Sequence, residues 1–224
     1  MTATIAPERQ PSRTRHRVAT AIGVLLLMGG LAIMGYFAWQ YIGSNIVAKH
    51  KQAQIKAETL RQWDKGVEGD AIAMLRVKRF GKDYEVPIVK GFDKGALARG
   101  VGWDTKSEKP GEIGNFAIAG HRVTHGEPFS KFPKLKKGDL VVVETRRDIY
   151  TYRLRNSGTS ITVSFTTPWP LWRVPDPKAR NRKPTERLIT MLTCSELFHT
   201  NNRSVVIGEL VKTYDKKQRT TATN

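Results

Sequence analysis

The sequence is poor in cysteine and in acidic residues, and both shortages limit what the protein can be. It has one cysteine, Cys194, and 20 aspartates and glutamates against 38 lysines and arginines, for a net charge of +18. A single thiol excludes a framework of internal disulfides. Acidic clusters suited to calcium are sparse, so we expect no calcium site.

The chain also lacks the motifs of nucleic-acid-binding proteins. Its basic composition indicates an anionic partner, such as nucleic acid, lipid headgroups or a polyanionic wall. The basic residues are spread over several segments, without a zinc-finger spacing or an aromatic RNA-binding strand. We therefore expect no nucleic acid among the partners.

One long uncharged stretch, residues 18–42, indicates a membrane protein. It holds 25 consecutive residues without a charge, and about twenty apolar residues suffice to span a bilayer as a helix. Arginines outnumber the single acidic residue before it, which predicts a cytoplasmic N-terminus and an extracytoplasmic domain. Aromatic residues at its outer end fit the membrane interface: Tyr36, Phe37, Trp39 and Tyr41.

A cleaved signal peptide is the alternative, because it also begins with basic residues followed by an apolar stretch. Small residues at 44–48 lie near a possible cleavage site. The apolar core of a signal peptide usually spans about 7 to 15 residues. The length of this run therefore favours an uncleaved, single-pass anchor in the cell membrane.

The rest of the chain divides by composition. Residues 1–17 are predicted to form a basic cytoplasmic tail, 43–66 a juxtamembrane stalk, 67–213 the folded domain and 214–224 a polar C-terminal tail. The stalk is rich in helix formers, with a flexible spacer as the alternative because no strong helical cap is evident. Its apolar residues are loosely spaced: Ile46, Ala53, Ile55, Leu60 and Trp63.

The folded domain has the pattern of a β protein. Short β-rich runs separated by Gly, Pro, Asn and Asp predict a mostly β fold, and their number fits an eight-stranded closed barrel with short helices, preceded by one N-terminal transmembrane helix. One or two helical turns are expected at 93–99. The expected strands lie at 71–77, 84–89, 115–119, 140–144, 149–154, 160–164, 187–192 and 204–211.

A long proline-rich loop at 165–185 interrupts the β pattern. Loops longer than about 12 to 15 residues are usually functional or disordered. This one carries Trp169 and Trp172, which argues against disorder. The two tryptophans either line a substrate groove or close the barrel.

Three segments place chemically useful side chains at strand ends: NFAIAGHR at 115–122, LITMLTC at 188–194 and NNRSVVIGEL at 201–210. His121 follows one apolar strand, Cys194 ends another, and Arg203 begins the next. Groups displayed at strand ends of a rigid sheet suit a preorganised site.

These three residues can perform acyl transfer through a thioester. A thiolate is a good nucleophile, an imidazole can give and take the protons, and a guanidinium can stabilise an oxyanion. Taken singly, Cys194 could be a buried apolar residue, His121 a strand-end histidine and Arg203 a surface charge. His125 and His199 are alternative bases, and Arg122 is the rival of Arg203, although Arg122 is expected to face solvent or a carboxylate.

The same segments carry a family resemblance over about 68–212. Residues 190–194, TMLTC, resemble the sortase signature T-L-x-T-C, with Met191 in place of leucine. Arg203 and the AGHR run at 119–122 resemble that family's arginine and histidine segments, in the same order. Among sortases, the chain is most similar to class E enzymes of actinobacteria. Those enzymes often have a tyrosine where GHRVTHG has His125.

The resemblance implies a sortase-type barrel and a role for each residue. Cys194 would attack the Thr–Gly bond of a C-terminal LAxTG- or LPxTG-type sorting signal on a secreted protein and hold it as a thioacyl enzyme. His121 would move the protons, and Arg203 would bind the oxyanion or the substrate backbone. The acceptor would be a peptidoglycan precursor amine, and no metal or organic cofactor is needed. The candidate substrate-binding residues are Thr193, His125, Trp169 and Trp172.

Two other functions stay open. A pilus-assembling sortase would use a lysine side chain as acceptor, but such enzymes often carry an N-terminal lid or a C-terminal membrane span, neither of which is evident here. A non-catalytic wall-binding or scaffold protein would use only the basic surface.

Overall fold

The computed structural model describes residues 13–196 and 201–216. The chain forms two compact units, Met1–Tyr41 and Ile42–Asn224. The first consists mainly of helix α1 (Arg13–Ala38), whose large apolar side chains are exposed. Within the described residues, one helix, which begins in this unit, contains a segment long and apolar enough to cross a membrane.

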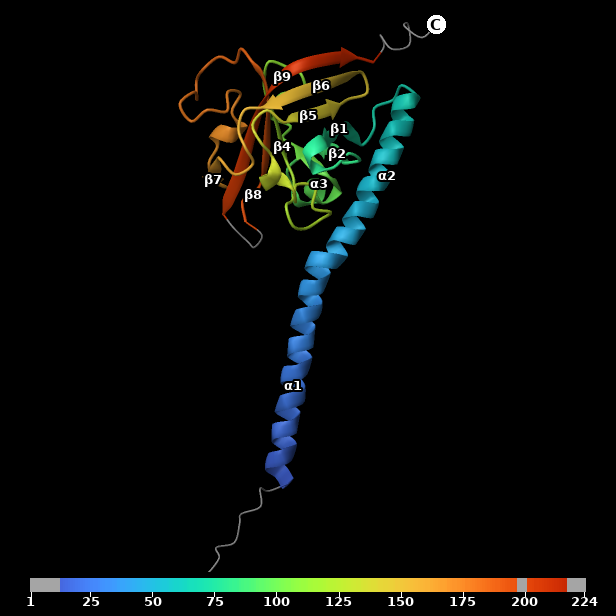
Figure 1. The fold of residues 1–224 in the computed structure, drawn as a ribbon. Coiled ribbons are helices and arrows are strands. Elements are labelled where there is room, and N and C mark those ends of the chain that lie inside the picture. The colour runs from blue at the N-terminus through green and yellow to red at the C-terminus, as the bar shows by residue number, and fades with distance from the viewer. Residues whose placement is uncertain (1–12, 197–200, 217–224) are drawn as a thin grey trace, which may run out of the picture. The chain divides into compact units, whose positions relative to one another are not determined.

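The second unit is built around a closed β-barrel (Figure 1). Eight strands follow the order β6-β5-β1-β2-β3-β4-β8-β9, and β9 returns to pair with β6; β7 pairs with β9 outside this ring. The strands are β1 (Ala71–Val77), β2 (Glu85–Lys90), β3 (Val101–Trp103), β4 (Gly114–Ala119), β5 (Leu140–Glu144), β6 (Asp148–Leu154), β7 (Thr162–Ser164), β8 (Arg187–Cys194) and β9 (Asn202–Asp215).

The barrel confirms the predicted mostly β fold and its eight strands, but one member differs. The run expected at 160–164 becomes β7, outside the closed ring. Its place is taken by β3, which has three residues and was not predicted. This strand exists through its pairing with β2 and β4 rather than through a local pattern.

Large apolar side chains fill the barrel. Phe116 on β4 pairs in register with Ile189 on the parallel strand β8, and both are buried. Phe129 and Phe132, from the segment after β4, pack against each other with ring centroids 5.5 Å apart. Each such side chain stabilises the fold by about 1.5–3 kcal/mol through burial.

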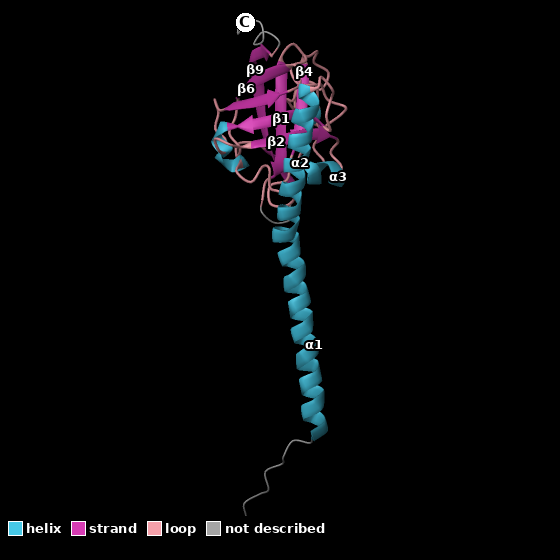
Figure 2. Ribbon diagram, turned by 90° about the vertical axis from the view of Figure 1, so that its right-hand side faces the viewer, coloured by secondary structure: helices cyan, strands magenta, loops and turns pink. Residues whose placement is uncertain are grey.

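Helices cover part of the barrel. Helix α2 (Ser44–Asp64) contacts β1, β2 and α3 (Lys94–Arg99), as Figure 2 shows. The helical turns expected at 93–99 correspond to α3, which Asp93 caps by accepting a hydrogen bond from Ala96 N at 3.0 Å. Shorter helical turns are η1 (Trp39–Gly43), η2 (Lys78–Phe80), η3 (Phe132–Lys134) and η4 (Trp169–Leu171).

The buried face of α2 includes only some of its apolar residues. Ile46 is 66% exposed and Ala53 is exposed, whereas Ile55 and Trp63 are buried. Polar side chains occupy much of the buried face, which consists of Asn45, Ala48, Gln52, Ile55, Thr59 and Trp63. The division of the chain into stalk and folded domain stays a prediction.

The buried hydrogen bond between Gly111 and Tyr152 can be tested by substitution. The Tyr152 ring is fully buried, and its hydroxyl oxygen accepts a hydrogen bond from Gly111 N at 2.8 Å. Tyr152→Phe keeps the ring but leaves this buried N–H unpaired, so we expect the free energy of unfolding to fall by about 1–3 kcal/mol. Urea unfolding of the full chain in detergent micelles measures it.

The matched control is Tyr150→Phe on the same strand. The hydroxyl of Tyr150 donates to Asp148 at 3.2 Å in a partly exposed position, where water can replace it. We expect the free energy of unfolding to fall less in Tyr150→Phe than in Tyr152→Phe. Equal losses for the two variants would contradict a structural role for the Gly111–Tyr152 bond.

Candidate active site

Strand pairing brings the three predicted site residues to one end of the barrel. Strands β4 and β8 run parallel and pair as far as Ala119 and Leu192, so His121 follows two residues after β4 ends. Strands β8 and β9 are antiparallel, and their register places Cys194 opposite Arg203. The thiol, the imidazole and the guanidinium therefore come from three neighbouring strands.

These residues line one cavity of about 380 Å³. Cys194, His121, Arg203 and Thr193 contribute to its polar wall. The apolar wall comes from the region of α3, from β7 and from the segment after β7: Phe92, Leu97, Val163, Phe165 and Leu171. A concave apolar pocket with a few convergent polar groups is the usual form of a binding site for a small ligand or a short peptide.

His121 lies in an environment that disfavours its charged form. Its ring stacks on that of His125, with centroids 4.6 Å apart and planes inclined by 22°. Burial lowers the pKa of His121 to about 4, and the positive charges of His125 and Arg203 act in the same direction. The imidazole is therefore neutral near pH 7 and available as a base.

Thr193 and Arg122 hold the end of β8. The Thr193 hydroxyl is buried and donates to Gly120 O at 2.8 Å, which ties β8 to the residue before His121. Arg122, which was expected to face solvent or a carboxylate, donates instead to the backbone carbonyls of Cys194, at 3.4 Å, and Ser195. This arginine thus supports the chain around the thiol, a role for which the sequence carries no signal.

Arg203 lies over an aromatic ring beside the cavity. Its guanidinium carbon is 5.9 Å from the ring centroid of Phe165, a cation–π distance. Its Nη1 donates to Asn202 O at 2.9 Å. Phe165 therefore helps to orient the guanidinium and also lines the cavity. No pattern in the sequence indicated either role.

The long loop after β7 reaches the cavity through residues other than its tryptophans. Phe165 and Leu171 belong to the lining, whereas Trp169 and Trp172 do not. Asn115 on β4 fastens the loop, because its side-chain amide donates to the backbone carbonyls of Pro170 and Trp172, both at 2.9 Å. Substrate-binding roles for the two tryptophans stay predictions.

The other histidine candidates differ in position. His125 stacks on His121 but does not belong to the cavity lining. His199 lies outside the described residues. In the part of the chain that the structure describes, no three His, Cys, Asp or Glu side chains form a group able to hold a metal ion.

Comparison with known proteins identifies relatives in sequence and in fold. A family model described as "Sortase domain" matches residues 75–211. The sortase SrtE1 of Streptomyces coelicolor is 31% identical over 86% of this chain, which spans 57% of that relative's length. The sortase E structure from Streptomyces avermitilis has a TM-score of 0.59 and 29% identity, covering 66% of this chain and 93% of that one.

Two further relatives are sortases of other bacteria. The SrtA sortase structure from Actinomyces oris has a TM-score of 0.59 and 30% identity, covering 67% of this chain and 84% of that one. Sortase A of Bacillus anthracis is 27% identical over 91% of this chain and 99% of its own length.

The depressed pKa of His121 predicts a pH-dependent stability. The unfolded chain binds this proton near pH 6.5 and the folded chain only near pH 4, so the folded state loses stability as the pH falls through that window. We expect a loss of about 3 kcal/mol from this group, which His121→Gln removes. Urea unfolding of the full chain in micelles, repeated from pH 7 to pH 4, measures it.

The control is His50→Gln, which changes an exposed histidine on α2. This variant should keep the wild-type pH dependence. If His121→Gln lost stability with acid as steeply as the wild type, burial of a neutral His121 would be ruled out.

Proposed function

The chain belongs to the sortase family, with class E sortases among its relatives, and we propose that it is a membrane-anchored cysteine transpeptidase that attaches secreted proteins to the cell wall. The observation that carries the proposal is the common cavity lined by Cys194, His121 and Arg203. These are the groups that acyl transfer through a thioester requires.

In the first half-reaction, the Cys194 thiol attacks the carbonyl carbon of threonine in the Thr–Gly bond of an LAxTG- or LPxTG-type signal. Neutral His121 takes the thiol proton as the bond forms. Arg203 donates hydrogen bonds to the resulting oxyanion. When the intermediate collapses, the His121 imidazolium gives its proton to the departing glycine amine, and a thioester to Cys194 remains.

In the second half-reaction, an amine of a peptidoglycan precursor attacks the thioester. His121 removes a proton from this amine and returns it to the Cys194 sulfur as the new amide forms. The enzyme is thereby restored with a neutral thiol and a neutral imidazole. Water in place of the amine would give slow hydrolysis.

The cavity walls suggest how a peptide would be held. The apolar surface around Phe92, Leu97 and Leu171 suits the leucine side chain at the start of the signal. Thr193, whose hydroxyl is engaged with Gly120, contributes to the wall and to the placement of Cys194. We keep Trp169 and Trp172 as outer substrate contacts, while His125 acts on His121 through the stacked rings.

We further propose that residues 18–42 anchor the enzyme with its N-terminus in the cytoplasm. Residues 1–17 would form the tail, 43–66 the stalk, 67–213 the extracytoplasmic catalytic domain and 214–224 the polar C-terminus. The exposed apolar side chains of α1 support the anchor.

Two substitutions test the chemistry. Cys194→Ala should remove all cleavage of fluorogenic LAxTG and LPxTG peptides, because no other thiol exists. Arg203→Lys should lower kcat/KM by about 100-fold or more, since a lysine cannot reproduce the planar donor fork and an oxyanion donor contributes about that much. Both are measured with the full chain in detergent micelles, with and without an amine acceptor.

Arg61→Lys, at an exposed position near the end of α2, is the matched control and should retain wild-type kcat/KM. Turnover that survived Cys194→Ala, or alkylation of Cys194 by iodoacetamide, would exclude the thioacyl mechanism. Near-normal activity of Arg203→Lys would remove arginine from the oxyanion role.

The anchor has its own test. We expect the mature protein to fractionate with membranes and to begin before residue 18, because the apolar run is longer than the usual core of a signal peptide. N-terminal sequencing of protein from membrane and soluble fractions measures this. A soluble product that begins beyond residue 42 would identify a cleaved signal peptide instead.

A further inference from the structure

The buried face of α2 carries a stripe of polar side chains. Asn45, Gln52 and Thr59 are spaced seven residues apart, close to two turns of helix, so they lie on one face. Their exposed fractions are 6%, 6% and 0%. Buried polar groups are usually hydrogen-bonded, and the partners of this stripe explain why it is polar.

Two of these side chains bind the backbone of the loop that follows His121. Asn45 accepts from Gly126 N at 2.8 Å and donates to Val123 O at 3.1 Å, and its amide also donates to the Glu127 carboxylate. Gln52 donates to His125 O at 3.0 Å. Helix α2 therefore holds residues 123–127, which we call the histidine loop, through hydrogen bonds to its main chain.

The histidine loop has a backbone that needs such support. His125, Gly126 and Glu127 have φ values of 53°, 85° and 54°, all in the left-handed region. Residues other than glycine adopt this region at a cost in free energy, and such conformations persist where the surrounding structure imposes them. A Cβ on Gly126 would also lie 2.7 Å from Gln52 Nε2, so the helix and the loop are in close contact here.

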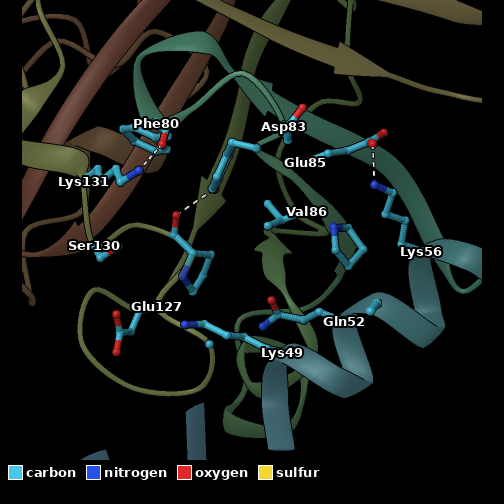
Figure 3. Close-up of a pocket in the computed structure, with 15 residues that line it drawn as sticks. Lys49, Gln52, Lys56, Phe80, Asp83, Glu85, Val86, Glu127, Ser130 and Lys131 are labelled. Carbon is cyan, nitrogen blue, oxygen red and sulfur yellow. Dashed lines mark hydrogen bonds and ion pairs between the residues drawn. The ribbon is translucent and has the colours of Figure 1, made fainter. Parts of the chain in front are cut away.

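Apolar packing does not enclose this junction completely. A cavity of about 410 Å³ lies beside it, bordered by Gln52 on one side and by Gly126 and Glu127 on the other. Figure 3 shows Lys49, Gln52 and Lys56 on α2, with Glu127 and Ser130 on the segment that faces them. Part of the loop therefore borders open space, and the hydrogen bonds from α2 are important in holding it.

The histidine loop in turn contacts the imidazole of the site. The His125 ring stacks on the His121 ring, and the chain turns back so that Phe129 N donates to His121 O at 3.0 Å. A displacement of the loop would therefore change both the orientation of His121 and the stacking of His125 against it.

We propose that Asn45 and Gln52 are positioning residues, through which α2 holds the histidine loop and so orients His121 for proton transfer. The inference rests on the proposed function, because it predicts that the turnover of sorting peptides depends on helix α2. Neither residue lines the cavity of Cys194; both act through the histidine loop, whose His125 ring stacks on His121.

The test compares two sets of variants in the full chain in detergent micelles. Asn45→Ala and Gln52→Met, alone and combined, remove the bonds to the histidine loop. Thr59→Val is the matched control, because it removes a buried hydrogen bond of the same helix face, from Ala71 N to Thr59 Oγ1 at 3.2 Å, at the start of β1. All variants are measured for kcat, KM, unfolding midpoint and amide exchange by mass spectrometry.

We expect the combined variant to lose about 10- to 100-fold in kcat, because a displacement of about 1 Å in a catalytic group has effects of that size. KM should change less than twofold, since neither substituted residue lines the cavity and its apolar wall is unchanged. Amide exchange in the peptide 121–129 should accelerate. Thr59→Val should match the wild type in kcat and in exchange at 121–129, whatever its unfolding midpoint.

Unchanged exchange at 121–129 in the combined variant would overturn the proposal, whether or not the protein turns over sorting peptides. Accelerated exchange with wild-type kcat would overturn the catalytic part. If the combined variant fails to fold, Gln52→Met alone is judged by the same two readouts. Absence of wild-type turnover would instead count against the proposed function, and the exchange measurement would still decide whether α2 holds the loop.

Discussion

The pairing of β8 with its two neighbours is the constraint on which the site depends. Its parallel ladder with β4 ends at Ala119 and Leu192, and its antiparallel ladder with β9 pairs Cys194 with Arg203. Because side chains alternate across a strand, a shift of either ladder by one residue would turn the thiol or the guanidinium to the other face of the sheet. Buried residues such as Ile189 hold this register, so core packing determines which groups share the cavity.

In the proposed mechanism, the environment of His121 determines the order in which the protons move. Burial, with the charge of Arg203 acting in the same direction, keeps the imidazole neutral at pH 7, so the proposed reaction cycle starts with His121 as a base. Arg203 has two effects in this arrangement. Its charge disfavours protonation of His121 in the resting site, and it favours the negative charge that develops when Cys194 attacks a carbonyl. In this proposal, the negative charge of the oxyanion would offset the repulsion between the Arg203 guanidinium and the His121 imidazolium.

Most of the strands, and the three residues that line the cavity, could be predicted because a local signal marks them. Alternation of apolar residues marks most strands, and Cys194 and His121 stand where apolar runs end. Strand β3 has no such signal, since three residues pair only because β2 and β4 lie on either side. The contacts of Arg122 with carbonyls at the end of β8 and of Phe165 with Arg203 join segments far apart in the chain, and no spacing encodes them. The apolar spacing of residues 43–66 does not indicate the polar stripe of α2, because a pattern of apolar residues carries no information about buried polar ones.

The polar stripe of α2 is better explained by the position that it gives the helix on the barrel than by a gain in the stability of the fold. An apolar helix face can shift along a barrel at a modest cost in free energy. Buried amide groups, in contrast, are satisfied only where they reach their hydrogen-bond partners. Asn45 and Gln52 meet backbone groups of the histidine loop, and Thr59 meets the first residue of β1. A rotation of α2 by one residue, about 100°, would leave all three without these partners. These partners favour one position of α2 on the barrel. Because Asn45 follows the apolar run by three residues, the start of α2 carries one of the side chains that bind the histidine loop.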